Sequence, residues 1–232
     1  MLKKNIALFK YKNIIFILMI PCLVMFSACV SNTLPQTTHD GLVLVSDTKF
    51  GEVYKKPYAQ LIEYKKFILA PCQVAFEKNW LGDQNMNRNL SQRVSQKDVN
   101  RIKQALSTEC DKYFKQALLQ EPAYPLTDIT DKDQPVLILR PSIINLEINA
   151  PDVRSPGRSR IFTTSAGEMT LFLELIDSIS GEILARVVDK RQGLDSGRMQ
   201  WTNSITNRVE AERILAQWAR LLRSELDAAY KQ

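Results

Sequence analysis

The feature that most constrains the fold of this chain is a β-hairpin predicted between residues 170 and 190. Side chains alternate along its first strand, with Leu171, Leu173 and Leu175 on one face and Thr170, Phe172 and Glu174 on the other. This period of two is typical of a half-buried strand. The turn Ser178–Gly181 leads into a second strand over Ile183–Lys190. If facing residues have numbers that sum to 360, Glu174 lies opposite Arg186, and Thr170 lies opposite Lys190.

Two long helices are predicted, one before the hairpin and one after it in the sequence. The first begins at the capping box Ser95–Asp98 and ends near Gln120, because the following Pro122 disfavours helical geometry before it. The second runs from about Asn207 to Tyr230. Apolar residues at helical spacing indicate a buried face on each helix. They are Val99, Ile102, Leu106, Cys110, Phe114 and Leu118 in the first, and Ala211, Ile214, Leu215, Trp218, Leu222 and Leu226 in the second. Mixed with glutamates, the arginines of the second helix predict a solvated face: Arg208, Arg213, Arg220 and Arg223.

Two further apolar runs predict strands. Residues 66–76 are continuously apolar, which predicts a strand buried on both faces, with Pro71 at a bulge or an edge. Residues 136–149 predict another strand, in which Pro141 indicates a bulge, and the polar residues 77–94 predict a loop. The order strand, helix, strand, strand, strand, helix predicts an α+β fold. We expect a single two-layer domain with two helices packed on a mixed, mostly antiparallel sheet.

The first 28 residues predict an export signal. A basic segment ends at Lys12, and an apolar run follows over residues 14–26, which is shorter than the roughly 20 residues that a membrane-spanning helix needs. The run ends in Phe-Ser-Ala-Cys29, which resembles the bacterial lipobox although Phe26 stands where leucine is usual. Cys22 is preceded by isoleucine and proline rather than small residues. We therefore expect residues 1–28 to be removed and Cys29 to carry acyl chains.

Lipidation of Cys29 implies a domain that is held at a membrane. Several acyl chains anchor a protein firmly, whereas one chain anchors it only marginally. The residue after the cysteine is Val30 rather than the aspartate that commonly retains lipoproteins at the inner membrane. We therefore expect the periplasmic face of the outer membrane, with the inner membrane as the alternative. Residues 29–49 predict a tether, whose apolar patch 41–46 docks on a globular domain of residues 50–232.

The basic charge of the chain is concentrated in the export signal. The whole sequence has 31 Lys+Arg and 25 Asp+Glu, a net charge of +6. Four lysines and no acid lie in residues 1–28, so the rest carries 27 basic and 25 acidic side chains, or +2. This balance gives no electrostatic argument for binding nucleic acid, and we expect none as a partner.

Cysteine and histidine are too few for many kinds of catalytic site. The single histidine, His39, lies in the predicted tether, so neither a Ser-His-Asp nor a Cys-His site is expected in the domain. Two cysteines without CxxC spacing also fail to supply a zinc site, and we expect no metal and no cofactor. Cys72 and Cys110 remain for a disulfide. A strand and a packed helix lie about 10 Å apart, whereas a disulfide needs Cα atoms within about 7 Å, so two buried thiols are favoured over the bridge.

Charged residues offer two candidate sites. The hairpin carries carboxylates that a hydrolase could use as an acid–base pair: Glu168, Glu174, Asp177, Glu182 and Asp189. Cross-strand ion pairs explain them better, so no catalytic residue is assigned. Arg154, Arg158 and Arg160 lie on a segment with Pro, Gly and Ser, and predict contact with an anionic lipid or an acidic protein surface. A solubilising loop is the favoured interpretation of this segment, and the anionic contact is the alternative.

Several strings, in this order and at these distances, resemble a known family. They are Tyr64-Lys-Lys with Pro71, Phe76-Glu-Lys-Asn-Trp80, Ala150-Pro-Asp152, Ala166-Gly-Glu-Met-Thr-Leu171, Asp177-Ser-Ile-Ser-Gly-Glu182 and Trp218-Ala219. The family is the bacterial lipoprotein family of domain of unknown function 3313, and the resemblance covers about residues 41–230. It implies a lipid-anchored envelope protein and brings no catalytic residue.

These observations predict a non-enzymatic binding or envelope-assembly module, whose partners are a membrane, through its acyl chains, and an envelope protein or anionic lipid. Two alternatives stay open. A carrier of a lipid or other apolar ligand requires a cavity between the helices and the sheet. A carboxylate-dependent hydrolase of envelope glycans requires a cleft lined by two hairpin carboxylates.

Overall fold

The computed structural model describes residues 34–128, 134–149, 151, 161–163, 166–193, 200–202 and 204–231. The proposed lipid attachment site, Cys29, and the arginines Arg154, Arg158 and Arg160 lie outside these residues. One compact unit extends from Pro35 to Gln232, so the folded unit begins earlier than the predicted boundary at residue 50.

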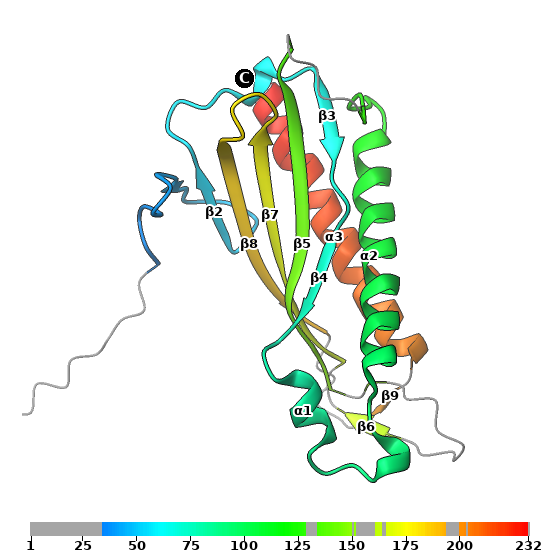
Figure 1. Cartoon of the computed structure of the whole chain (residues 1–232). Helices are drawn as coiled ribbons and strands as arrows, with labels where there is room; N and C mark the ends of the chain where they lie inside the picture. The colour runs from blue at the N-terminus through cyan, green and yellow to red at the C-terminus, as the bar shows by residue number, and fades with distance from the viewer. Residues whose placement is uncertain are drawn as a thin grey trace, which may run out of the picture. The chain divides into compact units, whose positions relative to one another are not determined.

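A seven-stranded mixed sheet forms one layer of this unit (Figure 1). Its strands are β1 (Val43–Leu44), β2 (Glu52–Lys55), β3 (Lys66–Leu69), β4 (Gln73–Phe76), β5 (Val136–Ile148), β7 (Gly167–Asp177) and β8 (Ile183–Gln192). The order is β1-β2-β8-β7-β5-β3, and β4 also pairs with β5. β3 and β4 run parallel to β5, whereas the other pairs are antiparallel. A separate two-stranded sheet joins β6 (Ile161–Thr163) to β9 (Gln200–Thr202).

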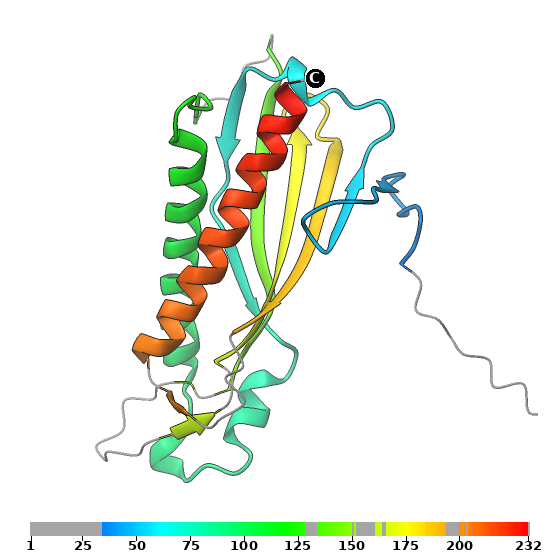
Figure 2. The same ribbon diagram turned by 180° about the vertical axis from the view of Figure 1, so that it is seen from behind.

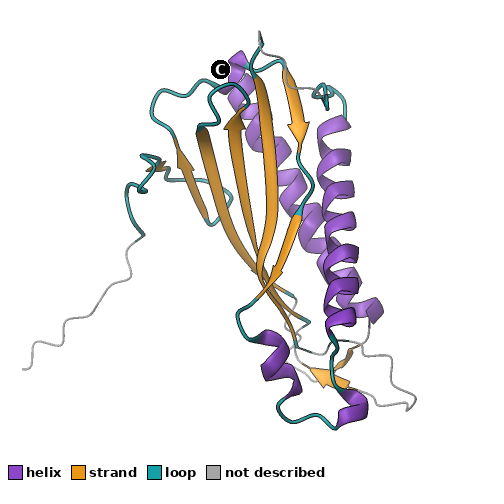
Figure 3. Ribbon diagram, viewed as in Figure 1, coloured by secondary structure: helices purple, strands orange, loops and turns teal. Residues whose placement is uncertain are grey.

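Two long helices, α2 (Gln96–Leu119) and α3 (Ser204–Tyr230), cover the same face of the large sheet, as the opposite views of Figures 1 and 2 show. Three short elements accompany them: α1 (Trp80–Asn85) and the 3-10 turns Leu61–Glu63 and Leu90–Gln92. The distribution of helix and strand in Figure 3 is that of a two-layer α+β domain, which confirms the predicted fold class. Among the described helices, none is long and apolar enough to cross a membrane.

The predicted helices and hairpin form with only small shifts at their ends. The Ser95 hydroxyl accepts a hydrogen bond from the Asp98 backbone N–H, and the Asp98 carboxylate accepts one from the Ser95 N–H, as the capping box predicts. α3 begins three residues before the predicted Asn207. In the hairpin, Glu174 pairs with Arg186 and Thr170 with Lys190, so the predicted register is confirmed.

The strand predicted over residues 66–76 is broken. β3 ends at Leu69 and β4 begins at Gln73, and neither half is buried on both faces. The break also explains Pro141, because the register places it between the β5 positions opposite β3 and β4, where no ladder bond is lost. The irregularity predicted at Pro141 is instead a bulge between Ile144 and Glu147, so that prediction was wrong in position.

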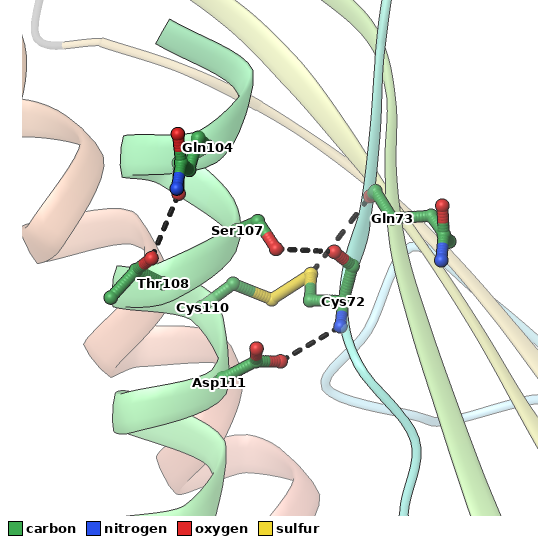
Figure 4. Close-up of a disulfide and its surroundings, with 7 residues drawn as sticks. All are labelled: Cys72, Gln73, Gln104, Ser107, Thr108, Cys110 and Asp111. Atoms are coloured by element: carbon green, nitrogen blue, oxygen red, sulfur yellow. Dashed lines mark hydrogen bonds between the residues drawn. A yellow bond between two sulfur atoms is a disulfide. The ribbon is translucent and has the colours of Figure 1, made fainter. Parts of the chain in front are cut away.

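The same break carries a disulfide that the sequence argument did not favour. Cys72 leaves the ladder and approaches α2, so that its Cα lies 6.2 Å from that of Cys110 and the two sulfurs are bonded (Figure 4). The Asp111 carboxylate accepts a hydrogen bond from the Cys72 N–H at 2.7 Å, and the Ser107 hydroxyl donates to the Cys72 carbonyl at 2.7 Å. The prediction of two free thiols was wrong because it assumed the ordinary distance between a helix and a regular strand.

The segment 35–49, predicted as a tether, is folded against the sheet. Leu42 is fully buried, and β1 pairs with β2, a strand that the sequence analysis did not predict. The Asp40 carboxylate pairs with Arg186 of β8 at 2.7 Å. The predicted docking of the patch 41–46 therefore takes the form of one strand, β1, which pairs with β2 at the edge of the sheet.

Candidate binding groove

An apolar groove of about 650 Å³ opens between α2, α3 and the ends of β5 and β7. Its floor consists of aliphatic side chains and a methionine: Ile102, Leu106, Leu146, Ile148, Met169 and Ile214. Ala105 and Ala211 add small side chains from the two helices, and Ala105 is exposed. A concave apolar site of this size, with charged groups at its edge, is typical of a ligand or partner site.

The groove exists because the sheet narrows while the helices continue. At the level of Leu175 the sheet is six strands wide, because pairing connects β1 through β2, β8, β7 and β5 to β3. At the level of Glu168 it joins three of the described strands, β5, β7 and β8. The apolar faces of α2 and α3 extend past the wide part of the sheet, so part of each face is left uncovered.

A bulge and a glycine shape the wall that β5 and β7 contribute. The register shifts between Ile144 and Glu147, where Asn145 has a φ of 50°. Gly167 has a φ of +138°, and a Cβ there would lie 2.0 Å from the Glu147 carbonyl oxygen. Only glycine fits this close approach. Bulges of this kind re-aim strand ends, and here the strand beyond the bulge supplies three lining residues: Leu146, Glu147 and Ile148.

Charged side chains form the rim of the groove, and carboxylates outnumber guanidinium groups. The carboxylates are Glu109, Glu147, Glu168, Glu210 and Glu212, and the guanidinium groups are Arg101 and Arg208. Three of the glutamates have ion-pair partners outside the lining: Lys112 at 2.8 Å from Glu109, Lys190 at 2.5 Å from Glu168 and Arg213 at 3.2 Å from Glu210. Glu212 pairs with Arg208 within the lining at 3.4 Å, so four of these five glutamates are ion-paired. The described lining is apolar inside, and its edge carries more carboxylates than guanidinium groups.

The hairpin carboxylates that suggested a hydrolase are engaged in separate contacts. Glu174 pairs with Arg140 and Arg186. Glu168 pairs with Lys190, Glu182 with Lys56, and Asp177 accepts hydrogen bonds within the turn. Among these five, only Glu168 lines the groove. Cross-strand and turn contacts therefore account for these carboxylates, which the sequence had suggested as candidates for an acid–base pair.

Asp189 differs most from its predicted role as an exposed hairpin carboxylate, because its side chain is buried. It is buried on the helix side of the sheet, where it accepts hydrogen bonds from the Trp218 indole at 2.7 Å, the Gly51 N–H at 3.0 Å and Arg191 at 2.7 Å. It therefore ties α3 to the strand β8 and to the turn before β2. The alternation of β8 is the sequence feature that indicates this burial, since Asp189 stands at a position of the strand's apolar face.

A second polar cluster holds the N-terminal segment against the outer face of the sheet. Arg186 bonds both Asp40 and Glu174, and the Glu174 side chain is buried. The hydrogen bond from Arg186, followed by that from Thr38, lowers the pKa of Asp40 below its usual range. Because Asp40 lies far from Arg186 in sequence, no local pattern indicates this contact.

Arg223 does not lie on a solvated face of α3, so that part of the helix prediction was wrong. Its guanidinium is buried and donates to the carbonyl oxygens of Ala117, Gln120 and Pro122, which satisfies backbone groups at the end of α2. It also pairs with Asp227 at 2.8 Å. Burial and the hydrogen bond to Asp227 raise the pKa of the neighbouring Tyr124 to about 12. This cluster fixes the crossing of the two helices that form the groove.

No group of His, Cys, Asp and Glu side chains in the described part of the chain is arranged to hold a metal ion. Trp80 packs in a small core: its ring stacks on Phe76 with centroids 4.2 Å apart, and its indole donates to the Ile148 carbonyl at 3.3 Å. The groove itself was missed, because its floor residues belong to the same apolar stripes as the core.

This architecture defines the class of the protein, a two-layer α+β domain with a pair of helices on one face of a mixed sheet. The chain belongs to a protein family of unknown function (DUF3313), whose profile matches residues 37–222. It matches no curated protein.

Several solved structures are similar in fold to the chain. PelC from Paraburkholderia phytofirmans, a dodecamer, is 11% identical with a TM-score of 0.35, over 74% of this chain and 98% of that one. Protein XCC0632 from Xanthomonas campestris is 11% identical with a TM-score of 0.40, over 75% and 93%. Rare lipoprotein B from Shewanella oneidensis is 15% identical with a TM-score of 0.31, over 70% and 95%. Likeness at this level carries no argument about function.

Proposed function

We propose that this protein is an envelope lipoprotein, anchored through Cys29 at the periplasmic face of the outer membrane, whose domain is a non-enzymatic binding module. The lipobox supports the anchor, and the Cys72–Cys110 disulfide supports export, because disulfides persist in oxidising compartments. The groove between α2, α3 and the sheet is the binding site. It is the observation on which the binding role rests.

The chemistry of the groove selects an apolar group with positive charge beside it. The floor offers no buried titratable side chain, whereas the rim carries five carboxylates and two guanidinium groups. Burial of apolar surface supplies the binding free energy, at roughly 25 cal/mol per Å². The acidic rim favours cationic flanks and steers their approach. The other four hairpin carboxylates make their contacts outside the groove lining, so none of them faces Glu168 as an acid–base partner there.

A substitution that fills the groove tests this site. Ala105 is exposed at the lining, so Ala105→Trp places a large ring in the groove without disturbing the core. Ala228→Trp is the matched control, because Ala228 is exposed on α3 away from the lining. The assay uses residues 29–232 with Cys29→Ser, at dilute protein concentration, and the neutral apolar dye N-phenyl-1-naphthylamine. We expect saturable binding that Ala105→Trp weakens at least about tenfold, or about 1.4 kcal/mol, and that Ala228→Trp preserves. Equal binding by both variants would exclude the groove.

The volume of the groove favours one second function, that of a carrier of a lipid or other apolar ligand. Sites for small ligands commonly enclose about 300–1,000 Å³, and the groove falls in this range. A carrier retains its ligand through purification. Mass spectrometry of organic extracts should then find one lipid at a stoichiometric amount in the wild type and in Ala228→Trp, but not in Ala105→Trp. An extract without lipid would reject the carrier function and leave the binding module.

A further inference from the structure

A clasped segment, defined as residues 80–94, projects beside the groove and carries two of the most exposed apolar side chains of the described chain. Met86 is 73% exposed and Leu90 is 82% exposed. In Figure 1 this segment lies between β4 and the start of α2, at the same end of the domain as the beginning of α3. The polar loop predicted there is a built structure, and it presents apolar groups to solvent.

The clasped segment is held by contacts of its own. The Asn85 side chain makes two hydrogen bonds of 2.8 Å to the Val94 backbone, one to its N–H and one to its carbonyl. Trp80 and Val94 are buried with Val99 in a small separate core, against which Ile148 packs. Because the base is fixed, Met86 and Leu90 are displayed by a preorganised segment, which lowers the entropic cost of binding a partner.

The charge of this segment is the opposite of that of the groove. The segment carries Arg88 and Arg93 against one acidic residue, Asp83, and Lys97 follows it at the start of α2. Arg88 bonds the Gln84 side chain and the Gln92 carbonyl, which are neutral groups, so its charge is not compensated within the segment. The groove rim has five carboxylates and two guanidinium groups. Two exposed apolar side chains beside an excess of cations therefore match an apolar floor whose lining has an excess of carboxylates, four of them ion-paired.

We propose that Met86 and Leu90 of one copy occupy the groove of a second copy of this chain. The two side chains are not seated in the groove of their own chain, since both are largely exposed. Segment and groove lie next to each other, joined through Ile148, which contributes to the lining and contacts the segment's core. Two copies can therefore bind reciprocally about a two-fold axis, the commonest symmetry of homo-oligomers. The inference rests on the proposed function, because it names the occupant of the same groove.

Sedimentation velocity on residues 29–232 with Cys29→Ser tests this self-association. We expect the wild type to shift from monomer at about 1 μM to dimer at about 100 μM, the range of a weak interface. The variant Met86→Asp/Leu90→Asp should raise the dissociation constant at least about tenfold, and so should Ala105→Trp. Ala228→Trp should dimerise as the wild type does. Added salt should weaken the dimer, because screening acts on exposed charges.

A mixture of the two defective variants separates lost complementarity from lost folding. The Ala105→Trp chain keeps its segment and the Met86→Asp/Leu90→Asp chain keeps its groove, so the equimolar mixture should form a mixed dimer where each variant alone is monomeric. No dimer in the mixture, or a wild type that stays monomeric at about 100 μM, would overturn the proposal. Dye binding by Met86→Asp/Leu90→Asp reports the groove alone. If this variant binds the dye while the wild type does not dimerise, self-association fails and the proposed binding site stands.

Discussion

The disulfide between Cys72 and Cys110 makes a quantitative prediction about stability. It joins the break between β3 and β4 to the middle of α2, across a sequence separation of 38 residues. Closing a loop of this length in the unfolded chain lowers its entropy enough to stabilise the folded state by about 4 kcal/mol. For a domain of this size, each kcal/mol corresponds to about 2–4 °C in the melting temperature. Loss of the bridge should then lower that temperature by about 8–16 °C.

Reduction tests the bridge without changing any side chain. We expect dithiothreitol to lower the free energy of unfolding of the wild-type domain in urea by about 4 kcal/mol. The variant Cys72→Ala/Cys110→Ala is the control, because it should unfold identically with and without the reductant. The variant alone is a poorer test, because both side chains are buried and their truncation adds the cost of cavities.

Two results would refute the reasoning about the disulfide. One is a wild-type unfolding curve that does not respond to dithiothreitol. The other is the titration of two thiols in the unfolded, unreduced mature chain, which would mean that Cys72 and Cys110 are free. A bridge that is present but contributes less than about 1 kcal/mol would instead mean that the unfolded chain keeps structure near the break, since the entropy estimate assumes a random chain.

Three further predictions concern single side chains. Asp189→Ala should destabilise the domain by about 3 kcal/mol in urea unfolding, because it leaves a buried indole and a backbone N–H without their acceptor; the exposed Asp83→Ala should have little effect. Asp40→Asn should lower stability at pH 7, and its difference from the wild type should shrink as the pH falls below about 4, because a lowered carboxyl pKa contributes its full stability above the unfolded value and loses it progressively as the pH falls toward the folded one. A constant difference down to pH 2 would contradict this. Cys29→Ser should abolish incorporation of radiolabelled palmitate in cells, whereas Cys22→Ser should keep it.

Local patterns predicted most of the fold because their causes are local. The hairpin follows from a period of two, and the cap of α2 needs only Ser95 and Asp98. The break in the strand 66–76 was less visible, since its apolar character is continuous and only Pro71 interrupts it. β1 and β2 were missed as strands because they are short and depend on pairing with each other and with β8.

The groove could not be predicted, and the reason is physical. Ile102, Leu106 and Ile214 were assigned correctly to the apolar faces of their helices. An apolar position that meets a strand and one that faces a groove have the same local sequence. What distinguishes them is the width of the sheet beneath, which follows from the lengths and registers of strands far away in sequence. The exposed Met86 and Leu90 were missed for a different reason, because the Asn-rich sequence around them reads as an open loop and does not reveal the hydrogen bonds between Asn85 and Val94 that close the segment.

The short link to the proposed anchor constrains how two copies can meet. Only residues 30–34 separate Cys29 from the compact unit that begins at Pro35. A fully extended chain spans at most about 3.6 Å per residue, so these five residues reach roughly 18 Å. The acyl anchors of two copies must therefore lie on the same side of the dimer to reach one membrane. A two-fold axis along the membrane normal satisfies this condition, whereas an axis in the membrane plane would point one anchor away from the membrane. Reciprocal binding through the groove is thus compatible with lipidation at Cys29 in one orientation, and confinement to a surface raises the effective concentration of its two partners.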